Sequence, residues 1–228
     1  MISHAKGIYR TMDKRKLKVV KFGGSSLADA QHFRQVAAIV NGDESRKFVI
    51  PSAPGKRSPD DFKVTDMFYE CYACASRGEN IDDIFAKIKE RYEMIIDGLG
   101  IDLDLSEEYQ VIKHSIRHHA GRDFAASRGE YLNGIILAKL LGTDFIDPAT
   151  VIKFSDNGSF DAELTNAILS AELKKHEMAV IPGFFGSMPN GTIKTFSRGG
   201  SDITGSIVAR AADASLYENW TDVSGFLM

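Results

Sequence analysis

The stretch KVVKFGGSS, residues 18–26, places Lys21 inside an apolar run that ends at two glycines and two serines. Glycine lets a backbone approach an anion closely, and a helix that follows offers free N–H groups at its positive end. Gly23, Gly24 and Ser25 are therefore candidate phosphate ligands, and the Lys21 ammonium could reach the same anion. An ordinary turn is the alternative, because neither G-x-x-x-x-G-K-[ST] nor G-x-G-x-x-G occurs.

A second cluster, SRGGSD at 197–202, combines an arginine, two glycines and an acidic residue. The fork of the Arg198 guanidinium can bind both oxygens of a carboxylate, and the glycines leave room for a ligand. Asp202 falls in the first turn of a predicted helix, where a carboxylate is also favoured for structural reasons alone. A solvated loop arginine and a helix cap are the alternatives to a binding site.

The motif SRGE at 127–130 places Glu130 on a predicted helix. An exposed helical glutamate is the ordinary expectation for this residue. If Glu130 instead faces the ligand edge of a sheet, its carboxylate would attract an ammonium group. A pocket with Arg198 and Glu130 would then suit an α-amino acid, with the carboxylate on the arginine and the amine on the glutamate.

Two further motifs carry weaker signals. The C-x-x-C of Cys71 and Cys74 lies within a helical stretch rather than at its start, so we expect two packed helix cysteines and no redox pair. His114, His118 and His119 have a spacing that could chelate zinc on a helix, but no acidic or cysteine ligand has a fitting position. A solvated helix face is expected there, and no metal site.

Strand-like and helix-like segments alternate along the chain, so the sequence predicts an α/β fold with a mainly parallel sheet and helices on both faces. Predicted strands lie at 18–22, 47–52, 143–148, 177–186 and 213–225, with a hairpin at 187–196 that turns at Asn190-Gly191. Predicted helices lie at 27–40, 162–175 and 201–212, and residues 64–141 form a helical excursion. Ser26 and Asp29 resemble a capping box for the first helix.

Ligands of such sheets bind beyond the carboxyl ends of the strands. The residues singled out so far fall at such ends, together with other candidates: Lys21 to Ser25, Ser52, Gly183 to Gly186, and Thr221-Asp222. The sequence therefore predicts one ligand site along this edge of the sheet.

Composition excludes several classes of function. The net charge of −3 gives no electrostatic reason to expect nucleic acid or a membrane surface as a partner. No apolar run approaches the ~20 residues of a membrane span. Two cysteines form no disulfide framework, so a reducing, cytoplasmic location is expected.

Taken together, the motifs resemble a known family. KFGGSS, SRGE, GFFGS, GTIKTFSRGGSD and WTDVSG occur in the order found in the aspartokinases of the amino acid kinase superfamily. PSAPGKR and KVTD, within residues 51–66, resemble the aspartokinase substrate loop. The resemblance runs from about Lys18 to the last residue, and it implies the three-layer α/β/α sandwich of that superfamily.

The resemblance implies transfer of a phosphoryl group from MgATP to the β-carboxylate of L-aspartate, which gives 4-phospho-L-aspartate. This is the first step of lysine, threonine and methionine biosynthesis. ATP and Mg²⁺ are the implied cofactors, and L-aspartate and MgATP are the implied partners. The full-length form is expected to be a homo-oligomer.

Site residues follow from the same resemblance. Lys21 would contact the ATP phosphates and stabilise the transferring group, and Asp202 matches the catalytic aspartate. A carboxylate substrate is already an anion and needs no strong general base, so Asp202 is expected to orient Lys21 or the metal-bound phosphates. The positions that match the aspartate site are Ser52, Ala53, Thr65, Glu130, Phe184, Arg198 and Ser201. The positions that match the ATP site are Lys21, Gly23, Gly24, Ser25, Thr221 and Asp222.

The chain departs from the family pattern in two places and in its extent. Ser197 stands where the family usually has glycine, and Ser224 replaces the second aspartate of TDVDG. Residues 1–16 are expected to be an N-terminal extension, and residues 17–228 an amino acid kinase domain that is incomplete at its C-terminus. ACT regulatory domains are expected to be absent from residues 1–228, and such a chain is expected to bind aspartate but to be a poor kinase.

Two rival hypotheses stay open at this stage. Another amino acid kinase, acting on glutamate, N-acetylglutamate or a nucleoside monophosphate, is the nearest. Glu130 discriminates here, because a free α-amino group needs a carboxylate partner and an acetylated amine does not. The chain could also be a non-catalytic aspartate-binding or assembly module.

Overall fold

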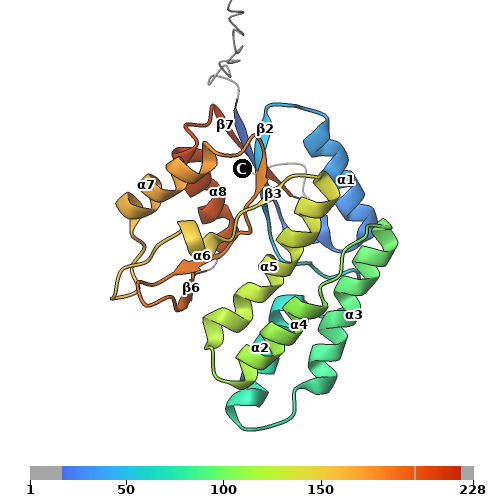
Figure 1. Ribbon diagram of the computed structural model, residues 1–228. Coiled ribbons are helices and arrows are strands. Elements are labelled where there is room, and N and C mark those ends of the chain that lie inside the picture. Colours follow the sequence, from blue (N-terminus) through green and yellow to red (C-terminus); the bar gives the residue numbers. More distant parts are fainter. Residues whose placement is uncertain (1–16, 198, 222–228) are drawn as a thin grey trace, which may run out of the picture.

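A five-stranded parallel sheet forms the centre of the computed structural model, which describes residues 17–197 and 199–221 (Figure 1). The strands lie in the order β3-β4-β2-β1-β7. Their bounds are β1 Lys18–Phe22, β2 Arg46–Pro51, β3 Asp144–Phe145, β4 Ala179–Val180 and β7 Leu216–Trp220. Strand β1 lies between β2 and β7. The carboxyl end of β1, where Lys21 and the glycines follow, is therefore inside the sheet and not at its edge.

Alternation along the strands divides the core into two layers. Val20, Phe22 and Val49 pack with α1 (Ala30–Asn41) and α5 (Arg122–Leu141) on one face. Val19, Phe48 and Ile50 pack with α7 (Ala162–Leu173) and α8 (Gly200–Ala211) on the other. Side chains two residues apart share a face, so Lys21 shares the face of Val19. The predicted α/β fold with helices on both faces is confirmed.

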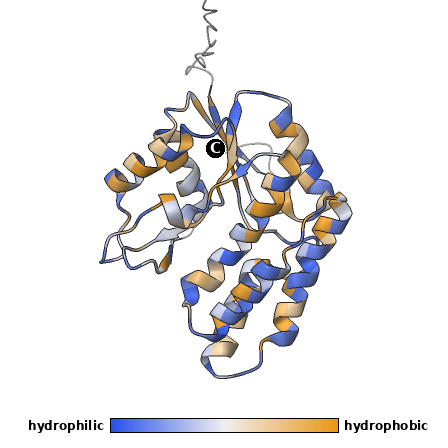
Figure 2. Ribbon diagram, viewed as in Figure 1, coloured by the Kyte–Doolittle hydropathy of each residue, from blue (hydrophilic) through white to orange (hydrophobic). Residues whose placement is uncertain are grey.

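The predicted helical excursion forms a lobe of α2 (Val64–Ser76), α3 (Asp82–Leu99), α4 (Ser106–Arg117) and α5. Its apolar side chains, among them Phe68, Ile88 and Ile112, join the core on the α1 side of the sheet. Figure 2 shows that these helices carry both hydrophobic and hydrophilic residues along their length. The lobe packs on the sheet through α5, which carries Glu130.

Two predicted elements are wrong in detail. Ser26 does not form a capping box, because residues Gly24–Leu27 form a 3-10 turn and α1 begins only at Ala30. Asp29 is the N-cap itself, and its Oδ1 accepts a hydrogen bond from the backbone N–H of His32 at 3.0 Å. The predicted strand at 177–186 is divided into two, because β4 ends at Val180 and β5 begins at Phe185, directly after Phe184 with its positive φ of 86°.

The predicted hairpin is confirmed. Strands β5 (Phe185–Ser187) and β6 (Ile193–Thr195) pair antiparallel in a separate two-stranded sheet. Gly191 has a φ of 82° in the connecting turn, a conformation that favours glycine. A short helix, α6 (Pro148–Val151), packs beside β5.

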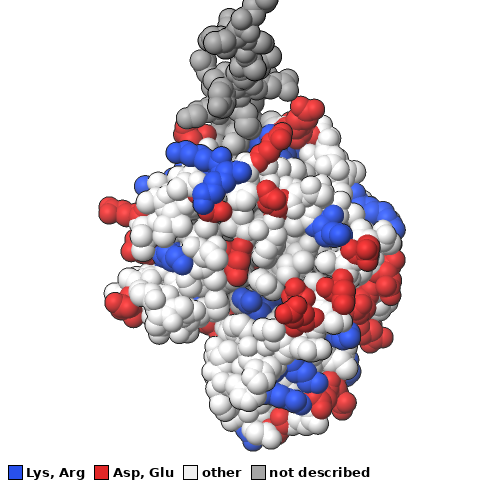
Figure 3. All heavy atoms as spheres, viewed as in Figure 1, with Lys and Arg blue, Asp and Glu red and all other residues white. Residues whose placement is uncertain are grey.

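The described surface carries charges of both signs. On the face shown in Figure 3, lysines and arginines alternate with acidic residues over most elements. Within residues 17–197 and 199–221, no helix is long and apolar enough to cross a membrane.

Candidate active site

Lys21 and Asp202, predicted from separate motifs, form an ion pair. Lys21 projects from β1 toward α8 and is only 7% exposed, while Asp202 lies in the first turn of α8. The Lys21 Nζ atom is 2.8 Å from Asp202 Oδ1. Asn219 on β7, the register partner of Lys21, donates from Nδ2 to the same oxygen at 3.1 Å. A positive group is thus held at the carboxyl end of a central strand.

Glycines allow α8 to approach the sheet closely. A Cβ on Gly200 would lie 2.6 Å from a ring carbon of Phe184, and a Cβ on Gly183 would lie 2.6 Å from Ser201 Cβ. The Phe184 N–H donates to Thr204 Oγ1 at 3.0 Å, which helps to fix its left-handed conformation. These glycines therefore have a packing role that places Asp202 against Lys21.

The glycine turn after β1 packs against the loop after β2. A Cβ on Gly24 would lie 2.8 Å from the Ala53 carbonyl oxygen, and the Gly55 N–H donates to the Gly24 carbonyl at 2.8 Å. Gly23 lies closer to the lysine, since a Cβ on it would lie 3.8 Å from Lys21 Nζ. The two loops thus pack directly against each other, and a larger residue at Gly24 would push them apart.

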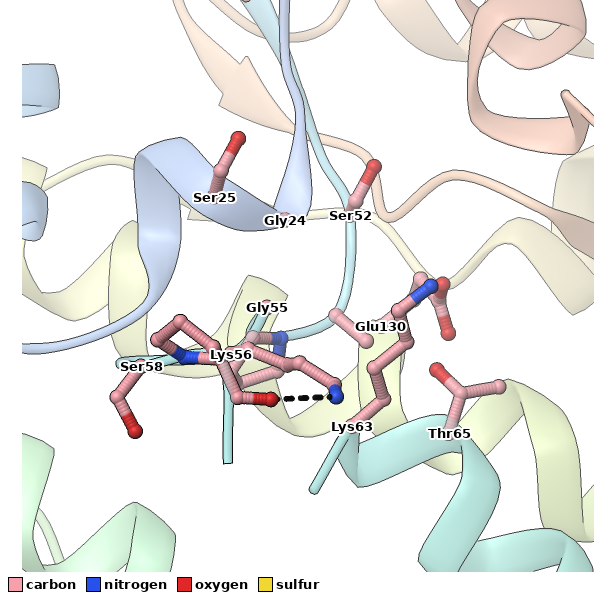
Figure 4. Close-up of a pocket in the computed structure, with 12 residues that line it drawn as sticks. Gly24, Ser25, Ser52, Gly55, Lys56, Ser58, Lys63, Thr65 and Glu130 are labelled. Atoms are coloured by element: carbon pink, nitrogen blue, oxygen red, sulfur yellow. Dashed lines mark hydrogen bonds between the residues drawn. The ribbon is translucent and has the colours of Figure 1, made fainter. Parts of the chain in front are cut away.

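A cavity of about 540 Å³ is lined in part by these two loops (Figure 4). It contains six of the predicted site residues, namely Gly24, Ser25, Ser52, Ala53, Thr65 and Glu130. The other lining residues come from the loop that joins β2 to α2, namely Pro54, Gly55, Lys56, Ser58, Pro59 and Lys63. Candidate phosphate ligands and candidate substrate ligands therefore share one space.

Glu130 is buried at the base of this cavity rather than exposed on its helix. It is 6% exposed, and its Oε2 atom has no hydrogen-bond partner among the described residues. Helix α5 can come this close because a Cβ on Gly129 would lie only 2.9 Å from Ala53 Cβ. Burial raises the pKa of the Glu130 carboxyl to about 8, although the backbone N–H groups of Glu130 and Ala53 oppose the shift. Among the described residues, the site therefore contains a buried carboxyl that forms no ion pair.

The remaining predicted residues lie elsewhere or outside the described chain. Phe184 and Ser201 pack at the start of α8 and do not line the cavity. Thr221 is exposed just beyond β7. Arg198 and Asp222 lie outside the described residues.

This geometry agrees with the comparison to known proteins. The model of the amino acid kinase family matches residues 16–228. The chain belongs to the amino acid kinase family. Its resemblance to aspartokinases is also confirmed, since it is 33% identical to aspartokinase 3 of Bacillus subtilis over 221 residues, which cover 91% of this chain and 49% of that protein.

Solved structures agree with the sequence relatives. The crystal structure of Clostridium acetobutylicum aspartate kinase matches this amino acid kinase with a TM-score of 0.91 and 51% identity, over 93% of this chain and 49% of that one. Escherichia coli aspartokinase III, in complex with aspartate and ADP, matches with a TM-score of 0.76 at 23% identity and supports the fold alone. The chain spans about half the length of these relatives.

The loop that joins β2 to α2 is contacted by a buried residue that the sequence analysis missed. Arg91 on α3 is buried, and its guanidinium contacts Asp61 Oδ2 at 2.5 Å and the Gly55 carbonyl at 2.6 Å. Asp61 also accepts from Arg57, and these arginines hold the pKa of the Asp61 carboxyl well below its usual range. Arg91 lies in an ordinary amphipathic pattern, so no signal in the sequence distinguishes it from a solvated arginine.

The weaker motifs lie on helices of the lobe, Cys71 and Cys74 on α2 and His114 on α4. Cys71 is buried within α2, and burial raises the pKa of its thiol to about 12. The rings of His114 and His118 stack with centroids 3.9 Å apart. Over the described ranges, no three His, Cys, Asp or Glu side chains gather in a way that could hold a metal ion.

Proposed function

We propose that this chain is the kinase domain of an aspartokinase and transfers the γ-phosphoryl group of MgATP to the β-carboxylate of L-aspartate. The observation that carries the proposal is the shared cavity. A glycine turn suited to phosphate lies on one side of it, and a buried carboxyl that pairs with no cation of the described residues lies on the other. The relatives named aspartokinase support the same reaction.

The positive charge of Lys21 at the carboxyl end of β1 suits the transfer of a phosphoryl group from one anion to another. Positive charge must bring two anions together and stabilise the charge that develops on the transferring group. Lys21, fixed by Asp202, supplies this charge with little reorganisation. Ser25 and the N–H groups of the glycine turn would hold the phosphates. The attacking carboxylate is already ionised, so Asp202 orients Lys21 and does not act as a base.

Mg²⁺ fits this site as an ion that arrives with the nucleotide. Proteins commonly hold Mg²⁺ through one or two carboxylates together with substrate phosphates. Asp202 is the half-exposed carboxylate beside Lys21 and is the residue that would contact it. When bound, the ion would neutralise phosphate charge.

The amino acid would be selected by its α-groups. Glu130 would accept the ammonium group, and that ammonium would be a partner for the Oε2 atom that has none among the described residues. Arg198, which follows from the family motif, would take the α-carboxylate. Thr65 and Ser52 line the same cavity as Glu130 and the glycine turn.

Calorimetry and product trapping test the proposal. L-aspartate and MgATP should each bind the chain with 1:1 stoichiometry, and hydroxylamine should trap aspartyl phosphate when both are present. L-glutamate and N-acetyl-L-glutamate serve as competing substrates. Preferential binding of N-acetylglutamate would indicate a different amino acid kinase. Binding of aspartate without any binding of nucleotide would indicate a binding module instead of an enzyme.

A further inference from the structure

One wall of the cavity carries a cation beside the buried carboxyl. Lys63, Thr65 and Glu130 lie on the same side in Figure 4, and Gly24 and Ser25 lie on another. Lys63 extends from the start of α2 toward the part of the cavity that Thr65 and Glu130 line. Lys63 follows two residues after Asp61, which the buried Arg91 contacts.

The Lys63 ammonium is available for a ligand. Within the part of the chain that the structure describes, it forms no hydrogen bond and no ion pair. The other cations near the cavity are engaged: Lys56 Nζ donates to the Pro59 carbonyl at 3.1 Å, drawn as the dashed line in Figure 4, and Lys21 is paired with Asp202. Lys63 is therefore the described lining cation without a partner.

The start of α2 adds to the positive potential of this wall. Lys63 is the N-cap position of a helix of 13 residues, and no side chain caps that terminus. The first turn of a helix carries free N–H groups and the positive end of the dipole, which favour an anion. Asp66 in the same turn opposes this effect in part. The buried, unpartnered Glu130 Oε2 independently indicates that a charged ligand belongs here.

We propose that Lys63, with the uncapped start of α2, is a second cation, in addition to Arg198, for the α-carboxylate of the amino acid whose ammonium group lies on Glu130. This inference rests on the proposed function. The β-carboxylate must face Gly24, Ser25 and Lys21 to receive the phosphoryl group. The ammonium and the α-carboxylate share one carbon, so the α-carboxylate lies on the Glu130 side of the cavity. Lys63 is thus a specificity residue that selects a free amino acid by pairing with its carboxylate.

Calorimetric titration of three variants tests this assignment. L-aspartate should bind Lys63→Met about three- to tenfold more weakly than wild type, as expected for the loss of one partly exposed charged contact. Lys63→Arg should recover most of the affinity. Lys56→Met is the matched control, because it removes a lysine from the same cavity. The affinity of this variant for L-aspartate should differ from that of wild type by less than twofold. MgATP should bind all three variants as it binds wild type.

The choice of ligand then identifies the carboxylate. L-asparagine keeps the α-carboxylate, so Lys63→Met should weaken its binding by the same factor. L-isoasparagine, the α-amide of aspartate, lacks that group, so wild type and Lys63→Met should bind it with the same affinity. An equal loss for aspartate and isoasparagine would overturn the assignment, as would an equal loss in Lys56→Met and Lys63→Met.

The two levels of the proposal fail in different ways. If wild type binds aspartate and Lys63→Met binds it equally well, Lys63 is not part of the pocket and the proposed function stands. If wild type binds no aspartate, the proposed function is wrong, and the assignment of Lys63 is overturned with it.

Discussion

Glu130 is an ionisable residue whose surroundings oppose its charge. Burial raises the pKa of its carboxyl to about 8, so at pH 7 this group is mostly protonated in the free protein. A ligand ammonium would stabilise the ionised form and lower the pKa. Binding of an amino acid is therefore coupled to release of a proton.

We expect L-aspartate binding at pH 7 to release most of one proton. Affinity should rise by up to about tenfold per pH unit below 8 and level off above it, because the ionised carboxyl is the binding form. Calorimetry in phosphate and in Tris, which differ in ionisation enthalpy, measures this proton. Glu130→Gln should abolish the release. An apparent enthalpy that is the same in both buffers for wild type would contradict the prediction.

The ion pair between Lys21 and Asp202 leads to a second prediction. Asp202→Asn removes the charge that orients Lys21, so turnover should fall by roughly 10²-fold, with little change in the KM for aspartate. Asn219→Ala is the control, because it removes only a neutral hydrogen bond to the same oxygen. Its turnover should stay much closer to that of wild type. Undiminished turnover of Asp202→Asn would show that Lys21 needs no such partner.

At the scale of elements, helix α3 holds the loop at 52–63 through Arg91, which contacts Asp61 and the Gly55 carbonyl. Arg91→Met would leave Asp61 and the Gly55 carbonyl without their buried partner, so the free energy of unfolding should fall by about 3 kcal/mol. Arg57→Met breaks a more exposed contact to the same carboxylate and should cost at most about 1 kcal/mol. Urea unfolding of both variants measures the difference. Equal losses would mean that Arg91 does not brace the loop.

The elements themselves follow from the sequence, with informative exceptions. Apolar alternation and helical spacing are local properties, so strands, helices and the hairpin at Asn190-Gly191 are predictable. The turn just before β5 is not, because a left-handed Phe184 is stabilised by Thr204 and by room at Gly200, which are distant in sequence. The capping box fails for a related reason. The pattern at Ser26 and Asp29 is correct locally, but a 3-10 turn pressed against the β2 loop takes up Ser26.

At the scale of the whole molecule, the sheet brings distant motifs to one edge. Parallel strands place Lys21, Ser52 and the start of α8 together, which sequence reasoning can predict from topology alone. The contact of Arg91 with Asp61 cannot be predicted in this way, because it depends on how the helical lobe docks on the sheet. Glu130 lies between these cases: its motif is evident, but its burial depends on Gly129 packing against Ala53.

Trp220, the single tryptophan of the chain, connects the glycine turn after β1 to the edge of the described sheet. Its ring lies 6.2 Å from that of Phe22 and 5.3 Å from the Arg46 guanidinium, and its carbonyl accepts from the Gly23 N–H at 3.4 Å. Phosphate binding at Gly23 to Ser25 would shift this environment. We therefore expect MgADP to cause a saturable change in tryptophan emission, and L-aspartate alone a much smaller one. Lys21→Met should remove the nucleotide response while leaving the emission of the free protein similar. A response to aspartate without any response to nucleotide would place the nucleotide away from the glycine turn.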